Sequence, residues 1–214
     1  MRPNKALDPL AFASLTYQVK HLGLSDYHHT WQAMRDYTLQ RTSESSDQLW
    51  FTQHNPVYTL GRAGSMEHLL QQTNIPLIKI DRGGEVTYHG PGQLVLYVLI
   101  DIFRAQIGIR SLVRHLEDSI IRMLAVHGVD ASNNPDAPGV YTNQGKIAAL
   151  GLSCKRRGTY HGLSLNIDMD LTPFQWINPC GINQPVTSLK QHGIHLSLKA
   201  AEQQLLHHFL NPND

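Results

Sequence analysis

Cys180 is the residue in this sequence whose neighbours best suit it to covalent chemistry. It lies in the run Asn178-Pro179-Cys180-Gly181 and is one of two cysteines in the chain. Proline and glycine favour a tight turn, which can expose the thiol. The thiolate is the nucleophile, so a cation that lowers the pKa of the thiol would activate it. Lys146, after Gln144-Gly145, is the candidate cation, although an isolated cysteine or lysine is more often unreactive.

A second group of polar side chains lies in the glycine-rich segment 82–93, which reads Arg-Gly-Gly-Glu-Val-Thr-Tyr-His-Gly-Pro-Gly-Gln. Glycines let a backbone approach a ligand closely. The segment is neither a P-loop nor a dinucleotide fingerprint, because no Gly-Lys-Ser/Thr and no helix follows it. A structural hairpin and a binding loop both fit the glycines. The polar side chains among them favour the binding loop, since functional groups concentrate on loops.

The elements that must position these residues can be read from hydrophobic spacing. Helical periodicity predicts helices over 27–39, 111–127 and 197–210. Apolar and alternating runs predict strands over 49–51, 57–60, 75–80, 94–100, 139–141, 146–154 and 159–167. Turn residues join the last three strands into two hairpins. We therefore expect an α/β fold of the α+β kind, with helices on one side of the strands, in a single domain over 1–214.

Composition limits the classes of partner. The 214 residues carry a net charge of +1 with neutral histidines, so no overall field favours nucleic acid or a membrane surface. No apolar run approaches the roughly 20 residues that span a bilayer. Two cysteines supply no disulfide framework, which predicts a reducing compartment, the cytosol. Thirteen histidines raise the question of a metal, but their spacing matches no known metal motif.

Four ordered motifs resemble those of the lipoyl(octanoyl) transferases of lipoate biosynthesis. They are the segment 82–93, Gly139-Val140-Tyr141 with Lys146 to Gly151, His161 to Asn166, and Ile177 to Gly181. The match covers about 50–190. Ala149 replaces a frequent serine, and Glu85 a common glutamine. The resemblance implies a mixed, largely antiparallel sheet with helices packed on it, similar to the catalytic domain of biotin and lipoate protein ligases.

The resemblance also implies an activity. An octanoyl group would leave the phosphopantetheine thiol of acyl carrier protein and reach the ε-amine of a lysine on lipoyl domains of 2-oxoacid dehydrogenases or on glycine cleavage H protein. Cys180 would carry it as a thioester and Lys146 would move protons, with no ATP or metal. His161 and Asn178 are possible auxiliary residues. The implied substrate-binding residues are Arg82, Gly83, Gly84, Glu85, Val86, Thr87, Tyr88, His89, Ala149, Leu150, Gly151, Gly162, Leu163 and Ser164.

Three other functions stay open on the sequence. An ATP-dependent lipoate or biotin ligase would share the fold but would need no nucleophilic cysteine. A silent carrier-binding protein would keep its function after Cys180→Ser. A metal protein is the third. The basic run Lys155-Arg156-Arg157 is either a solvated hairpin tip or a docking patch for acidic partners, and we interpret Cys154 as a bystander.

Overall fold

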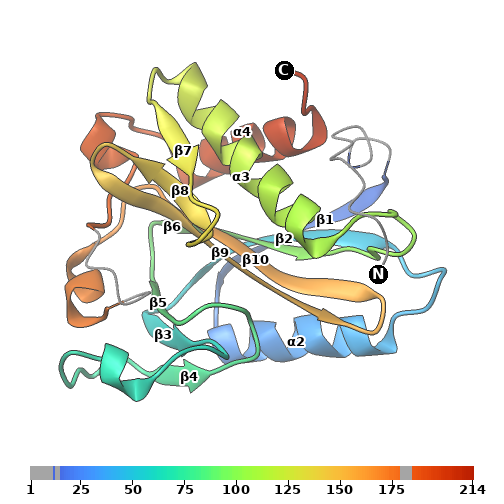
Figure 1. Ribbon diagram of the computed structural model, residues 1–214, viewed down its shortest axis with the longest axis horizontal. Helices are drawn as coiled ribbons and strands as arrows, with labels where there is room; N and C mark the ends of the chain where they lie inside the picture. Colours follow the sequence, from blue (N-terminus) through green and yellow to red (C-terminus); the bar gives the residue numbers. More distant parts are fainter. Residues whose placement is uncertain (1–11, 13–14, 179–184) are drawn as a thin grey trace.

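The computed structural model describes Phe12, residues 15–178 and residues 185–214. Cys180 therefore lies outside the described residues, as do its neighbours Pro179 and Gly181. The chain forms a large twisted sheet with helices on its faces and a small sheet below it (Figure 1). No helix in the described part is long and apolar enough to cross a membrane.

The large sheet has the strand order β1-β2-β6-β10-β9-β8-β7. In that order the strands are Tyr17–Ser25, Asp47–His54, Gln93–Leu99, Gly158–Asn166, Gly145–Lys155, Gly139–Thr142 and Ala131–Asn133. Within the described residues β1 and β2 run parallel, and the other neighbours in this sheet are antiparallel. This confirms the mixed, largely antiparallel sheet, and both predicted hairpins are present as β8–β9 and β9–β10.

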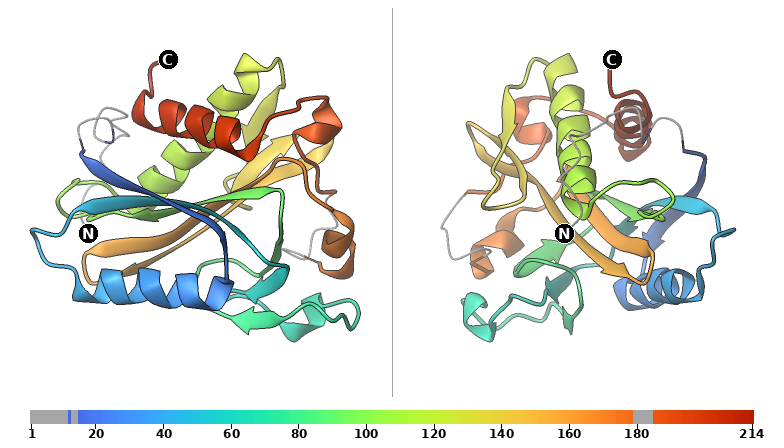
Figure 2. Two further views of the ribbon diagram at one scale, coloured as in Figure 1. Left: turned by 180° about the vertical axis from the view of Figure 1, so that it is seen from behind. Right: turned by 45° about the vertical axis from the view of Figure 1, so that its right-hand side comes forward.

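Both faces of the large sheet are covered. Along β6, Leu94, Leu96 and Val98 belong to the core under α3 (Ile109–Val126) and α4 (Leu198–Leu210). The alternate residues Val95, Tyr97 and Leu99 pack with Met34 of α2 (Tyr27–Gln40) on the other face, and Figure 2 shows from behind that α2 runs along that face. This continuous burial explains the unbroken apolar run of β6. The expectation of helices on one side was wrong for α2.

The small sheet is built from β4 (Leu77–Lys79), β3 (Val57–Leu60) and β5 (Val86–His89), in that order. The glycine-rich segment thus contains a strand of its own, so the expectation of a simple loop was incomplete. β2 and β3 are separated by two residues, yet they belong to different sheets. Short 3₁₀ turns, η1 (Met66–His68), η2 (Thr172–Trp176) and η4 (Lys190–His192), complete the described elements.

Candidate active site

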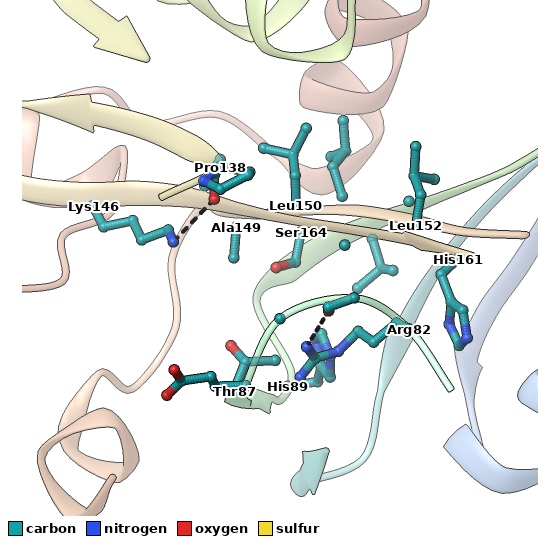
Figure 3. A pocket seen from close by; sticks show the side chains of 18 of the residues that line it. Arg82, Thr87, His89, Pro138, Lys146, Ala149, Leu150, Leu152, His161 and Ser164 are labelled. Atoms are coloured by element: carbon teal, nitrogen blue, oxygen red, sulfur yellow. Dashed lines mark hydrogen bonds between the residues drawn. The ribbon is translucent and has the colours of Figure 1, made fainter. Parts of the chain in front are cut away.

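A cavity of about 440 Å³ lies between the β9–β10 hairpin and the segment that leads into and through β5. Its lining includes Lys146 and nearly all of the predicted binding residues, from both the glycine-rich segment and the two strands. Figure 3 shows Lys146 at one end and His161 at the other, with Arg82, Thr87 and His89 facing the strands. The separate motifs of the sequence therefore meet around one space.

Lys146 is half-buried and its ammonium is held by the wall of the cavity. Its Nζ donates to the Pro138 carbonyl at 3.2 Å and lies 5.3 Å from the centre of the Tyr141 ring. Gly139 makes this position possible, because a Cβ there would lie 2.5 Å from Lys146 Cε and 2.8 Å from the Ala148 carbonyl oxygen. Three neighbouring residues of one hairpin therefore fix the direction of the lysine chain.

The backbone of Lys146 also holds the chain that follows the turn of Cys180. Lys146 N donates to the Pro185 carbonyl at 2.8 Å, and Thr187 N donates to the Lys146 carbonyl at 3.0 Å. Before the turn, Asn178 N donates to the His68 carbonyl at 2.8 Å. Both described ends of the segment that carries Cys180 are thus anchored, one of them on Lys146 itself.

Arg82 is buried and ties the glycine-rich segment to the small sheet. Its guanidinium donates to the Thr59 carbonyl and the Thr59 hydroxyl, both at 2.9 Å, and to the Gly83 carbonyl at 2.9 Å. A Cβ on Gly61 would lie 2.3 Å from the Gly84 carbonyl oxygen, so the chain passes there without room for a side chain. Arg82 therefore holds the backbone of the cavity wall in place and also brings a positive charge to it.

His89 is a buried, neutral histidine. Its Nδ1 lies 2.7 Å from Oε1 of Gln93, whose amide nitrogen donates to the Asn166 side chain at 2.9 Å. Nδ1 therefore carries the hydrogen, and Nε2 is left as an acceptor. Burial lowers the pKa of His89 to about 3, and the nearby His54 adds to the shift. His89 can accept a hydrogen bond but stays uncharged at neutral pH.

His161 has an uncommon backbone conformation at the opposite end of the cavity. Its φ is +63° within strand β10, where it is 1 % exposed. Its Nε2 lies 3.1 Å from Asp81 Oδ1, which also accepts from Trp31 Nε1 at 3.1 Å, while Tyr160 donates to Asp81 Oδ2. Burial lowers the pKa of His161 although Asp81 opposes the shift. The pKa of Asp81 is lowered by its three donors, which outweigh its desolvation.

Some predicted residues do not reach the cavity. Tyr88 packs with Tyr58 in the core of the small sheet. Asn178 is absent from the cavity lining, although its backbone is anchored as described above. Glu85, by contrast, does line the cavity. Its carboxylate lies 2.7 Å from His68 Nδ1, so the residue that replaces the common glutamine has a partner for its charge.

The basic run and the second cysteine lie at the far end of the β9–β10 hairpin. Arg156 donates to the Leu39 carbonyl at 2.9 Å, and Arg157 pairs with Asp101 at 2.9 Å. These contacts favour a structural role for the two arginines. Cys154 is half-buried, and burial together with Asp101 raises the pKa of its thiol, consistent with a bystander.

Several residues around the site were not assigned to it from the sequence. Tyr27, Tyr97 and Asn166 line the cavity, Asp81 holds His161, and Glu117 lies behind the Lys146 wall. Glu117 had a visible signal, since it is a carboxylate on the apolar face of the predicted helix 111–127. Tyr27 and Tyr97 come from a helix and a strand outside the motifs, whereas Asp81 and Asn166 directly adjoin or end a motif, and the convergence of all four depends on the tertiary fold.

Comparison with known proteins agrees with this geometry. Residues 26–210 match the model of the lipoyl protein ligase A/B catalytic domain. An octanoyltransferase of Chromobacterium violaceum is 55% identical over 191 residues, which are 89% of this chain and 92% of that protein.

Solved structures show the same fold at low identity. Lipoate-protein ligase A bound with ATP aligns with a TM-score of 0.76 at 14% identity, over 91% of this chain and 84% of that one. Biotin protein ligase from Aquifex aeolicus in complex with biotin and ATP aligns with a TM-score of 0.54 at 13% identity, over 91% and 68%. On the sequence comparisons, the chain belongs to the lipoyl protein ligase A/B catalytic domain family and, within it, to the octanoyltransferases.

Proposed function

We propose that this enzyme transfers an octanoyl group from the phosphopantetheine thioester of acyl carrier protein to the ε-amine of a lysine on a lipoyl domain, through a thioester on Cys180. The acceptors would be lipoyl domains of 2-oxoacid dehydrogenases and glycine cleavage H protein. One observation carries the mechanism: the cavity ends at Lys146, whose own backbone anchors the segment that follows Cys180.

Chain length supports a meeting of the two residues. Cys180 is two residues after Asn178, so its Cα lies within about 7 Å of the Asn178 Cα. It is five residues before Pro185, which is hydrogen-bonded to Lys146. The second limit, about 18 Å between the Cα atoms of Cys180 and Pro185, is compatible with a thiol at the Lys146 end of the cavity, as the proposed dyad requires.

The transfer takes place in two balanced steps. In the first, the Cys180 thiolate attacks the thioester carbonyl, an S–C bond forms to Cys180, and the carrier thiolate leaves with a proton from the Lys146 ammonium, which becomes a free amine. In the second, the acceptor amine attacks the new thioester, an amide bond forms, and Cys180 leaves as a thiolate. The Lys146 ammonium lowers the pKa of the Cys180 thiol, and Lys146 as a free amine takes the proton from the acceptor. Transfer of an acyl group from one thiol to another requires no ATP and no metal.

A backbone donor for the oxyanion can be assigned by strand alternation. Gly83 N donates to the Leu152 carbonyl at 3.1 Å, so the Leu152 peptide groups point away from β10. Peptide groups alternate along a strand, and those of Leu150 therefore point to the same side, just beyond the last β8 partner at Ala149. Strand β10 is paired on both sides, so we place the oxyanion at the Leu150 N–H rather than at Gly162 to Ser164.

The apolar part of the cavity suits an acyl chain. Val95, Leu152 and Leu163 belong to its lining, beside the glycines that let the walls approach. Each buried CH₂ contributes on the order of 0.8 kcal/mol. Binding of the eight-carbon chain can therefore hold the thioester carbonyl at the Lys146 end while the carrier protein stays outside.

Intact-mass spectrometry tests the proposal directly. After incubation with octanoyl-carrier protein, without ATP and with EDTA, the wild type should gain one octanoyl group. Cys180→Ala should show no adduct, and Cys154→Ser should behave as the wild type. Octanoyl transfer by Cys180→Ala at the normal rate would contradict the covalent mechanism, and an absolute need for ATP would instead indicate a ligase.

A further inference from the structure

We propose that Glu117 is a positioning residue for Lys146 and acts through the single peptide group between Pro138 and Gly139. The inference rests on the proposed function, in which Lys146 moves the protons of acyl transfer. Glu117 lies in the middle of α3, on the far side of the cavity wall, and is itself 5 % exposed.

The contacts form one continuous line. Glu117 Oε1 accepts from Gly139 N at 3.0 Å, and the carbonyl of the same peptide, on Pro138, accepts from Lys146 Nζ at 3.2 Å. A trans peptide points its N–H and C=O in opposite directions. The carboxylate and the ammonium therefore lie at opposite ends of one peptide dipole, in the order that strengthens both hydrogen bonds.

The contacts of Glu117 favour its ionised form. Its second oxygen, Oε2, accepts from Asn133 Nδ2 at 3.0 Å. Both carboxylate oxygens therefore accept hydrogen bonds from nitrogen donors, which stabilise the negative charge. Burial raises the pKa of Glu117, while the Gly139 and Asn133 donors oppose the shift. A buried charge needs such partners, and here one of them leads directly to the lysine.

The arrangement has two consequences for Lys146. The carboxylate fixes the orientation of the Pro138 carbonyl, which sets where the ammonium lies. It also makes that carbonyl oxygen more negative, so the charged form of the lysine is favoured and its pKa is raised relative to a variant with a neutral residue at 117. Gly139 completes the line, because a Cβ there would displace the lysine chain.

Other charged groups lie around this line. On α3 itself, Arg114 and Asp118 pair with each other at 3.1 Å and are partly exposed. From the facing elements, Asp136 and Glu85 line the cavity, and the Tyr141 ring faces the ammonium. Glu117 is distinguished by the direct hydrogen bond that its carboxylate accepts from Gly139 N.

The test compares Glu117→Gln with the wild type by the pH profile of kcat/KM for octanoyl transfer. Glutamine can still accept from Gly139 N–H, but it removes the negative charge. The limb, the part of the profile that reports the titration of Lys146, should move to lower pH, because the pKa of Lys146 falls. In addition, kcat should fall roughly 10- to 100-fold with little change in KM. The double variant Glu117→Gln with Asn133→Asp should recover the melting temperature, because the amide can donate to the new carboxylate, yet the limb should stay displaced.

A buried residue on the same helix supplies the control. His115 Nε2 contacts the Phe209 carbonyl at 2.8 Å and has no link to the cavity. His115→Gln should lower stability and leave the pH limb unchanged. The inference would be overturned if the pH profile of Glu117→Gln matched that of the wild type. It would also be overturned if the loss of activity were fully explained by a smaller fraction of folded enzyme. If Lys146→Ala keeps the wild-type rate and limb, the proposed function fails instead, so the two failures are distinguishable.

Discussion

The two ends of the cavity hold their titratable groups in opposite ways. At one end, Lys146 is half-buried, and its ammonium contacts a backbone carbonyl and an aromatic ring. At the other end, His89 and His161 are 7 % and 1 % exposed and are tied to Gln93 and Asp81. Burial lowers the pKa of both histidines. The difference supports the proposal that Lys146 transfers protons, whereas the two histidines hold the shape of the site.

The largest effect is expected at the lysine end. Lys146→Ala should reduce octanoyl transfer by roughly 10²- to 10⁴-fold, the range that a general acid or base supplies. The melting temperature should change little, because the side chain is only half-buried. Steady-state rates and thermal unfolding of the same preparation check this. His89→Gln, with a far smaller change in rate, is the matching variant at the other end, and equal losses in both variants would break the comparison.

Gly139→Ala should displace the Lys146 side chain while leaving its amine chemically unchanged. The new Cβ would lie 2.5 Å from Lys146 Cε, so the lysine chain must move. A displacement of about 1 Å at a reacting group can reduce the rate by 10²-fold, and we expect roughly a 10- to 100-fold loss in kcat. Gly108→Ala is the control, since the nearest atom to its Cβ would be 3.9 Å away. Similar rates for both variants would show that the lysine tolerates displacement.

Three buried histidines predict a dependence of stability on pH. The pKa falls to about 3 for His89 and to about 4 for His54 and for His115. The unfolded chain, with an ordinary histidine pKa near 6.5, therefore binds more protons than the folded one as the pH falls below that value. Stability is full above about pH 6.5 and is lost toward pH 4, by about 2 kcal/mol per histidine at pH 5.

Urea unfolding at pH 5 and pH 7 measures this loss. His115→Gln removes one such histidine, which does not line the cavity, and should reduce the difference in unfolding free energy between the two pH values by about 2 kcal/mol. A stability that does not change over this range would mean that the histidines are hydrated or charged in the folded protein, and the contrast between the two ends would be lost.

Helices and strands were predicted correctly where buried apolar residues recur at regular spacing along the sequence. The helix α3 and the apolar strand β6 were evident because each buries a regular pattern against the core. Strand β1 was missed because most of its residues are exposed at the sheet edge. Strand β5 was missed because its glycine-rich surroundings are typical of a loop. Local patterns cannot show edge pairing, which depends on a partner far along the chain.

The sequence motifs located most of the cavity lining, but the connections between its residues could not be predicted. The segment 82–93 and the β9–β10 hairpin were found from their motifs and do line one cavity. Their roles depend on partners that the sequence does not link, such as Asp81 for His161 across 80 positions and Glu117 for Gly139 across 22. The position of Cys180 relative to Lys146 stays a prediction.

The smallest effect is expected from Asp81→Asn. Asparagine can still accept from Trp31 and His161 through its oxygen, and its nitrogen can donate to Tyr160, so the geometry is largely kept. What is lost is the charge, and hydrogen bonds to a charged group exceed neutral ones by about 1 kcal/mol. We expect stability to fall by about 1–2 kcal/mol, with turnover per folded molecule within a few-fold of the wild type. Denaturant midpoints and active-site-normalised rates measure the two quantities separately. A loss of turnover as large as that of Lys146→Ala, without a loss of stability, would place proton transfer at the histidine end and reverse the assignment of the two ends.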